Sequence, residues 1–169
     1  MARQIWNLTM KIVLKIFIIM TLAWIILTPG TSLSQSVKVT GTWSETIDNT
    51  DLVGGAGTDL ISTYESAANA CDIDITGAAK KNWRVDINKV DTLWHTNLHL
   101  YVRRTADGTG GGTISGGTTY QEITDVSQTF FSGYDNLRNI TIQHQLTGVS
   151  VQVGPNTYST EIYYTIVSL

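Results

Sequence analysis

Charge, cysteine and proline are all scarce in this sequence, and each scarcity narrows what the protein can be. Only 15% of the 169 residues are charged and the net charge is −3, so the chain lacks the basic surface that nucleic-acid binding needs. Cys71 is the single cysteine, which excludes an internal disulfide and predicts a small buried apolar residue. Two prolines beside 15 glycines, with Gly, Thr and Ser between short apolar runs, are typical of β-rich secreted proteins.

Long apolar runs are also missing, except for one near the N-terminus. Residues 16–27 carry no charge and follow a segment with three positive charges, which is the anatomy of a secretory signal peptide. Ser32 and Ser34 are small residues that suit the −3 and −1 positions of a cut before Gln35. The sequence therefore predicts export, and the protein is expected to be secreted or held at the cell surface.

This leader divides the chain into a signal peptide, 1–34, and a single domain, 35–169. The alternative is an uncleaved membrane anchor, but a spanning helix needs about 20 apolar residues and Lys15 interrupts the run here. Membrane contact is therefore expected only through the signal peptide. A domain of this length buries enough surface to fold without a disulfide or a metal.

Alternation of apolar and polar residues with a period of two dominates the rest of the chain and predicts short strands with one apolar face. Trp83, Val85 and Ile87, for example, share one face of their strand and are expected in the core, as is Trp94. The segments that show this alternation are 37–43, 73–75, 83–87, 94–103, 120–123, 129–131, 140–146, 149–153 and 158–167.

About eight short strands joined by turn signals predict an all-β fold. The expected architecture is an antiparallel β-sandwich, immunoglobulin-like or jelly-roll-like, after an N-terminal signal helix. A closed barrel is the alternative. Segment 48–70 is the exception to the strand pattern and is expected to form a short helix or a long loop.

The predicted strand 94–103 presents a polar face that could bind a ligand. Sugar rings stack on exposed aromatic side chains, with amide, acidic and basic groups supplying hydrogen bonds. The side chains on this candidate ligand-binding face are His95, Asn97, His99, Tyr101 and Arg103.

The histidines of this face do not predict a metal site. His95 and His99 are four residues apart, which on a strand separates them by about 13 Å, too far to share one ion easily even with His144 added. A solvated sheet face is the better interpretation, and no metal or other cofactor is expected.

Three other patterns are equally weak as sites. Acidic pairs at 48 and 51 and at 72 and 74 could suit calcium, although the second pair suits the polar face of a strand. The glycine-rich stretch 107–117 lacks the following helix that a phosphate loop needs, so a flexible hairpin tip is expected. No nucleophile elbow or other catalytic constellation is present, so no catalytic residue is predicted and the protein is not expected to be an enzyme.

The two ends of the predicted domain carry candidate assembly strands. A long alternating strand at the edge of a sheet can complete a neighbour's sheet, with backbone hydrogen bonds supplying affinity and side-chain pockets supplying register. The candidate residues are Val37, Val39 and Trp43 at the N-terminal end and Tyr158, Ile162, Tyr164 and Ile166 at the C-terminal end.

The leader, the short Thr- and Gly-rich strands and the closing YSTEIYYTIVSL resemble bacterial secreted immunoglobulin-like surface proteins, such as fimbrial subunits and spore-coat-U-like proteins. The chain departs from them in lacking the cysteine pair that many such subunits carry. The resemblance implies an exported structural or adhesive protein, in one form a filament subunit, whose partners are copies of itself or other surface proteins. A carbohydrate-binding module with glycan partners and an enzyme of unrecognised type are the alternatives.

Overall fold

The computed structural model describes residues 34–169, so the predicted signal helix and almost all of the predicted leader lie outside the described residues. None of the described segments forms a helix with the length and hydropathy that a membrane crossing requires. The described elements are β1 (Ser36–Gly41), the 3-10 turn η1 (Asn49–Asp51), β2 (Thr63–Glu65), β3 (Cys71–Thr76), β4 (Asn82–Leu93), β5 (His99–Arg104), β6 (Thr113–Gly116), β7 (Gln121–Glu122), β8 (Gln128–Tyr134), β9 (Leu137–Thr147) and β10 (Ser159–Ser168).

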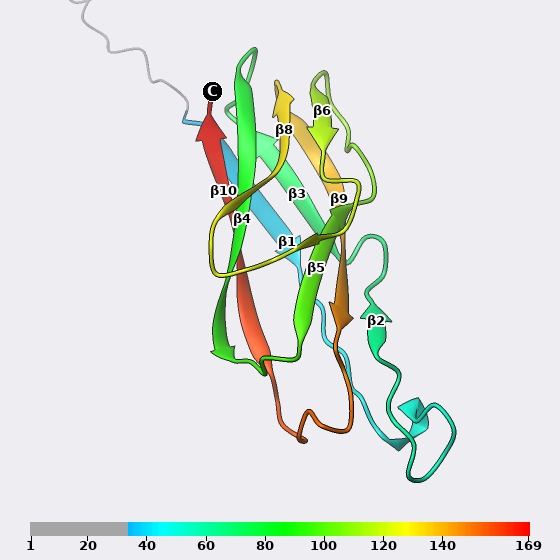
Figure 1. The fold of residues 1–169 in the computed structure, drawn as a ribbon. Helices are drawn as coiled ribbons and strands as arrows, with labels where there is room; N and C mark the ends of the chain where they lie inside the picture. The colour runs from blue at the N-terminus through cyan, green and yellow to red at the C-terminus, as the bar shows by residue number, and fades with distance from the viewer. Residues whose placement is uncertain (1–33) are drawn as a thin grey trace, which may run out of the picture. The chain divides into compact units, whose positions relative to one another are not determined.

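These strands form two antiparallel sheets that pack face to face (Figure 1). The six-stranded sheet has the order β1-β3-β9-β5-β7, with β2 also pairing with β9, and the four-stranded sheet has the order β10-β4-β8-β6. The predicted antiparallel β-sandwich is therefore confirmed. The barrel alternative is wrong, because each sheet ends in its own edge strands rather than closing on itself.

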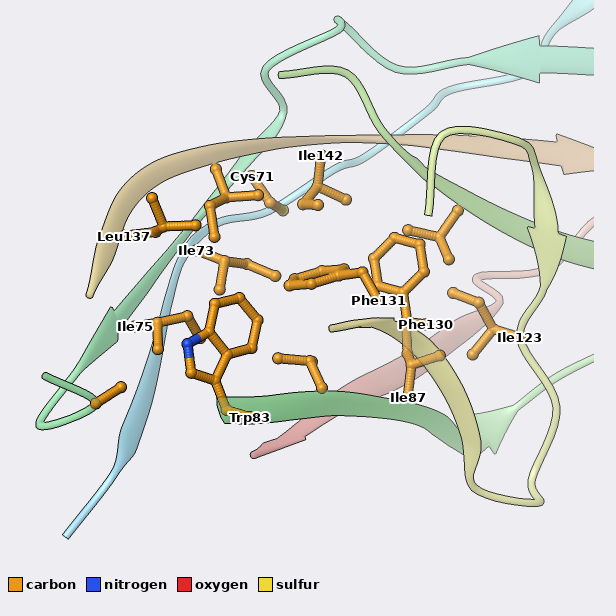
Figure 2. Packing of buried hydrophobic residues seen from close by; sticks show 14 of the residues in the cluster. Cys71, Ile73, Ile75, Trp83, Ile87, Ile123, Phe130, Phe131, Leu137 and Ile142 are labelled. Atoms are coloured by element: carbon orange, nitrogen blue, oxygen red, sulfur yellow. The ribbon is translucent and has the colours of Figure 1, made fainter. Parts of the chain in front are cut away.

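The alternating apolar residues meet between the two sheets and form one core (Figure 2). Ile73 and Ile75 from β3 and Trp83 from β4 are fully buried, as predicted. The ring of Trp83 packs edge to face on Phe131, and its Nε1 donates a 2.7 Å hydrogen bond to the carbonyl oxygen of Asp135. Burial of each such side chain stabilises the fold by about 1.5–3 kcal/mol, which fixes the register of every strand that contributes.

The predicted continuous strand 94–103 is wrong in its first half. β4 ends at Leu93 in the four-stranded sheet and β5 begins at His99 in the other sheet, so the chain must change layers between them. A tight turn makes this crossing, in which the amide of Leu98 donates to the carbonyl of His95 at 3.0 Å. The indole Nε1 of the half-buried Trp94 caps the same turn by donating to the carbonyl of Leu98.

Residues 149–153 also differ from expectation, whereas segment 48–70 forms the expected long loop with a short helical turn and adds only the short strand β2. Residues 149–153 do not form a strand, because the chain leaves β9 at Gly148 and turns toward the other sheet, with the amide of Val153 donating to the carbonyl of Ser150. Segment 48–70 contains the 3-10 turn η1 and β2 within a long loop. Asp48 caps η1 by accepting from the amide of Thr50.

The glycine-rich stretch 107–117 is not a hairpin tip, because it leads from β5 in one sheet to the other sheet and contains β6 itself. It lies close against the connection between β8 and β9. A side chain at Gly108 or Gly112 would overlap the backbone carbonyls of Arg138 and Tyr134, respectively. The glycines are therefore required for the close approach of two backbones rather than for flexibility.

Gly148 gives a test of the crossing from β9 toward β10. Its φ of +81° is left-handed, and a Cβ atom there would overlap the carbonyl oxygen of Asn97. We expect Gly148→Ala to lower the free energy of unfolding by roughly 1–3 kcal/mol in a urea titration, because both strain and overlap act against the alanine. Gly154→Ala is the matched control, since nothing lies within 4 Å of its Cβ position. Equal stability of the two variants would contradict this account.

Candidate functional site

The two strands at the ends of the described chain are both edge strands. β1 is the outermost strand of the six-stranded sheet and pairs with β3, and β10 is the outermost strand of the four-stranded sheet and pairs with β4. Within residues 34–169, each therefore has one free edge along which its N–H and C=O groups have no ladder partner. Such an edge is a template for pairing with another chain.

Both free edges lie on the same side of the sandwich, which we call the β1/β10 side. Gln35, just before β1, donates from Nε2 to the carbonyl of Asn82 at 3.2 Å and accepts from Oγ of Ser168 at 2.6 Å. The amide of Leu169 donates to the same Asn82 carbonyl. The start of β1 therefore lies beside the end of β10, and the two strands run in opposite directions (Figure 1).

The structure places the predicted N-terminal assembly residues in different environments. Val37 lies on β1, half-buried and packed against the core, whereas Val39 faces inward on the same strand but remains 38% exposed. Trp43 follows β1 rather than belonging to it. Its indole stacks on the ring of His144, with 6.3 Å between the ring centroids.

The predicted C-terminal assembly residues face inward. Ile162, Tyr164 and Ile166 lie on the inner face of β10 and are partly buried against the core, while Tyr158 precedes the strand. They hold β10 in its own sandwich. A partner at this edge would meet the backbone and the outward side chains instead, which were not among the predicted residues. The alternation of the sequence does identify these outward side chains, because they are the residues between the apolar ones.

β10 lacks the devices that usually protect an edge strand. Its ten residues include no Lys, Arg or Pro, and its register with β4 is regular after a shift at Ser159/Thr160. Tyr163 is 46% exposed on its outer face, where its hydroxyl donates to Glu161, the one charged residue of the strand. The remaining edges are shorter, because β6 has four residues and β7 has two. The long open edges are therefore gathered on the β1/β10 side.

A buried histidine lies behind this side, between the sheets. His144 is 3% exposed, and its Nδ1 has no hydrogen-bond partner among the described residues. Its Nε2 lies 3.4 Å from the hydroxyl of Tyr164 on β10. Burial lowers the pKa of His144 to about 4 and raises the pKa of Tyr164. Nearby Cys71 is buried, as predicted, and burial raises the pKa of its thiol.

The candidate ligand-binding face is only partly assembled. His99, Tyr101 and Arg103 alternate with buried residues along β5 and lie on the outer face of the six-stranded sheet. His95 and Asn97 do not join them, because both lie in the turn between the sheets. That turn is stabilised locally: the amide of Asn97 donates to Nδ1 of His95 at 3.2 Å.

Polar neighbours hold the side chains of this face in place. The Arg103 guanidinium donates twice to Oε1 of Gln143, at 2.9 and 2.7 Å, and lies 4.6 Å from the ring centroid of Tyr120. Tyr101 is half-buried and directly opposite Gln145 on one neighbouring strand and Glu122 on the other. The result is an aromatic ring flanked by an amide and a carboxylate on the outer face of the six-stranded sheet.

The histidines are dispersed rather than clustered. His144 points into the core, His95 lies in a turn, and Nδ1 of His99 lies 2.6 Å from Oε1 of Glu122 on the outer face. In the part of the chain that the structure describes, no group of three or more His, Cys, Asp or Glu side chains is placed to hold a metal ion.

The acidic pairs have local structural roles. Asp48 and Asp51 form a reciprocal capping box around η1, in which each carboxylate accepts from a backbone amide. Asp72 and Asp74 alternate with buried residues along β3, and Asp74 also accepts from the amide of Asn139 at 2.9 Å.

Comparison with known proteins gave no match, whether to a family model, to a curated protein or to a solved structure. Function must therefore be inferred from the geometry of the sites themselves.

Proposed function

We propose that this chain is an exported structural or adhesive protein of the cell surface that associates through its free edge strands, as the subunit of a filament or a surface layer would. The observation that carries the proposal is the placement of β1 and β10. Each is an edge strand of its own sheet, and the open backbone edges of the two strands lie on the same side of the sandwich. Its partners are copies of itself or other surface proteins.

The chemistry of the edge supports association through backbone hydrogen bonds. An added strand gains one ladder of N–H to C=O bonds, and the side chains beside it set the register. β10 offers this over ten residues with one charged side chain, Glu161, and no proline. The signal-peptide pattern of residues 1–34 supports export to a compartment where such assemblies form.

A charge placed on the edge tests this proposal. Thr165 is exposed on the outer face of β10, where a lysine is a typical deterrent to strand pairing. In a bacterial host that expresses the full chain, we expect wild-type protein to be retained in the surface fraction and accessible to added protease. Thr165→Lys should instead lower the ratio of surface-bound to released protein by roughly tenfold, so that most of the protein is found in the medium. The added lysine weakens the pairing of β10 with a neighbouring strand.

Thr129→Lys is the matched control. Thr129 is also an exposed threonine of the four-stranded sheet, but it lies on β8 between β4 and β6 and away from the open edges. It should behave as wild type does. Intracellular protein in all three cases would refute export, and equal retention of the two lysine variants would refute association through β10.

One observation favours carbohydrate binding as a second candidate. Tyr101 lies between Gln145 and Glu122 on the outer face of the six-stranded sheet, next to the guanidinium of Arg103, which Gln143 holds in place. An aromatic surface with polar groups at its rim suits the stacking and hydrogen bonding of a sugar ring.

Glycan-array binding by the purified domain tests this candidate. We expect Tyr101→Ala to weaken any specific signal by about tenfold or more, because the stacking surface is lost while the sheet remains. Tyr163→Ala on β10 is the control, since Tyr163 is exposed on the other sheet. Binding that survives Tyr101→Ala, or absence of binding by the wild type, would remove the carbohydrate proposal.

A further inference from the structure

The β1/β10 side has inward-facing apolar groups that its own sandwich does not cover. Val39 points toward the inner face of its sheet yet is 38% exposed, and Val37 and Ile162 are only half-buried. In the centre of the sandwich, by contrast, inward residues such as Ile73 and Val85 are fully buried. The side therefore combines two unpaired backbone edges with an incompletely covered apolar interior, which together call for a covering partner.

A single added strand cannot satisfy this side. β1 and β10 belong to different sheets, so their free edges are separated by the spacing between the sheets, and one extended peptide would pair with one edge and leave the other open. A second copy of this chain presents two edges at the same spacing. Of the candidate occupants, it is the one whose geometry matches both edges at once.

We infer that the β1/β10 side joins a second copy about a two-fold axis roughly parallel to the strands, with β1 of each copy pairing with β10 of the other. This inference rests on the proposed association through edge strands and specifies its partner and symmetry. Rotation about such an axis brings the six-stranded sheet of one copy level with the four-stranded sheet of the other. Because β1 and β10 run in opposite directions, both new ladders are antiparallel (Figure 1).

The hydrogen bond between Ser168 and Gln35 determines which residues meet across the interface. It places these two residues at the same height along the strands, and rotation about an axis parallel to the strands keeps that height. The six residues of β1 therefore face the C-terminal half of the partner's β10. Lys38 is then expected close to Thr165 of the second copy. That half of β10 contains no charged residue, so nothing there opposes Lys38. The interface contains two such ladders, and each covers the exposed Val39 of the β1 strand that it contains.

This arrangement closes rather than propagates. One contact pairs all of β1 with the C-terminal half of β10, and the edges that stay open are the N-terminal half of β10 and the short strands β6 and β7, with four and two residues. An isologous contact of this kind yields a dimer, whereas a filament needs a second, different contact. Light scattering is therefore expected to reach a plateau at twice the monomer mass as concentration rises.

The experiment uses residues 34–169, because the two sheets and the buried cluster between them belong to one compact unit. Wild type and Thr129→Lys should be dimers at micromolar concentration, and Thr165→Lys should dissociate at least tenfold more readily, because its lysine faces Lys38 of the partner in both ladders.

The possible outcomes separate this inference from the function it rests on. Growth of wild-type assemblies beyond a dimer, abolished by Thr165→Lys, would overturn the closed dimer while supporting edge association. A strict monomer at all concentrations would overturn the second copy as partner. If such a monomer still showed surface retention that Thr165→Lys abolished, another surface protein would be the partner. A dimer indifferent to charge at Thr165 would place the contact elsewhere and overturn the inference.

Discussion

Replacement of Trp83 by alanine is expected to lower the free energy of unfolding by about 3–5 kcal/mol, which is the range for removal of a large buried aromatic side chain. Trp83 is fully buried at the centre of the core, and its ring packs on Phe131 with 6.0 Å between centroids (Figure 2). The variant also leaves the Asp135 carbonyl without its indole donor. For a domain of this size, the melting temperature should fall by roughly 10–15 °C.

Two further variants test this account, one at the same position and one at a half-buried tryptophan. Trp83→Phe keeps an aromatic ring but loses the donor to Asp135, so it should cost less than alanine, on the order of 1–3 kcal/mol. Trp94→Ala removes a half-buried indole at the edge of the core and should also cost less than Trp83→Ala. Thermal unfolding followed by far-ultraviolet circular dichroism measures all three without relying on tryptophan fluorescence. A Trp83→Ala variant as stable as Trp94→Ala would contradict the core described here.

The sequence predicted the sandwich because period-two alternation reports directly on which face of a strand is buried. Trp83, Val85 and Ile87, which alternate with polar residues in the sequence, all face the core in the structure. The same signal fails where the chain changes sheets. His95 and Asn97 keep the alternation of β5 but lie in a turn, because alternation says nothing about the position at which a strand ends.

The candidate site was predicted less completely, since it depends on long-range arrangement. That β1 and β10 are edges, and that their free edges share one side, follows from pairings between segments far apart in the chain. Buried Arg104 was missed for a related reason. It has the inward parity of Leu100 and Val102, but only the structure shows that its guanidinium pairs with Asp107 and with the carbonyl of Gly116.

Acid is expected to destabilise this domain through His144. The imidazole is buried between the sheets, where desolvation disfavours its charged form and lowers its pKa to about 4. Among the described residues, the groups packed around it are uncharged: the Trp43 indole stacks on it, the Tyr164 hydroxyl lies 3.4 Å from Nε2, and Val102 is its cross-strand neighbour. A proton on the ring would therefore be an uncompensated charge in the core.

The sign of the pH dependence follows from the lowered pKa. Above the ordinary histidine value of 6.5, the ring is neutral in both the folded and the unfolded chain, and the contribution of His144 to stability is complete. As the pH falls from 6.5 to about 4, only the unfolded chain takes up the proton, so stability decreases by about 1.4 kcal/mol per pH unit. The total loss is about 3 kcal/mol, beyond which the folded chain is also protonated.

Urea titrations from pH 7 to pH 4 measure this loss, and the variant His144→Gln identifies its source. It keeps a polar side chain but cannot titrate at this position, so its stability should be nearly constant between pH 6.5 and pH 5, whatever its value at pH 7. Acid-sensitive stability between pH 6.5 and pH 5 that persisted in His144→Gln would mean that a group other than His144 causes the loss, and would contradict this account.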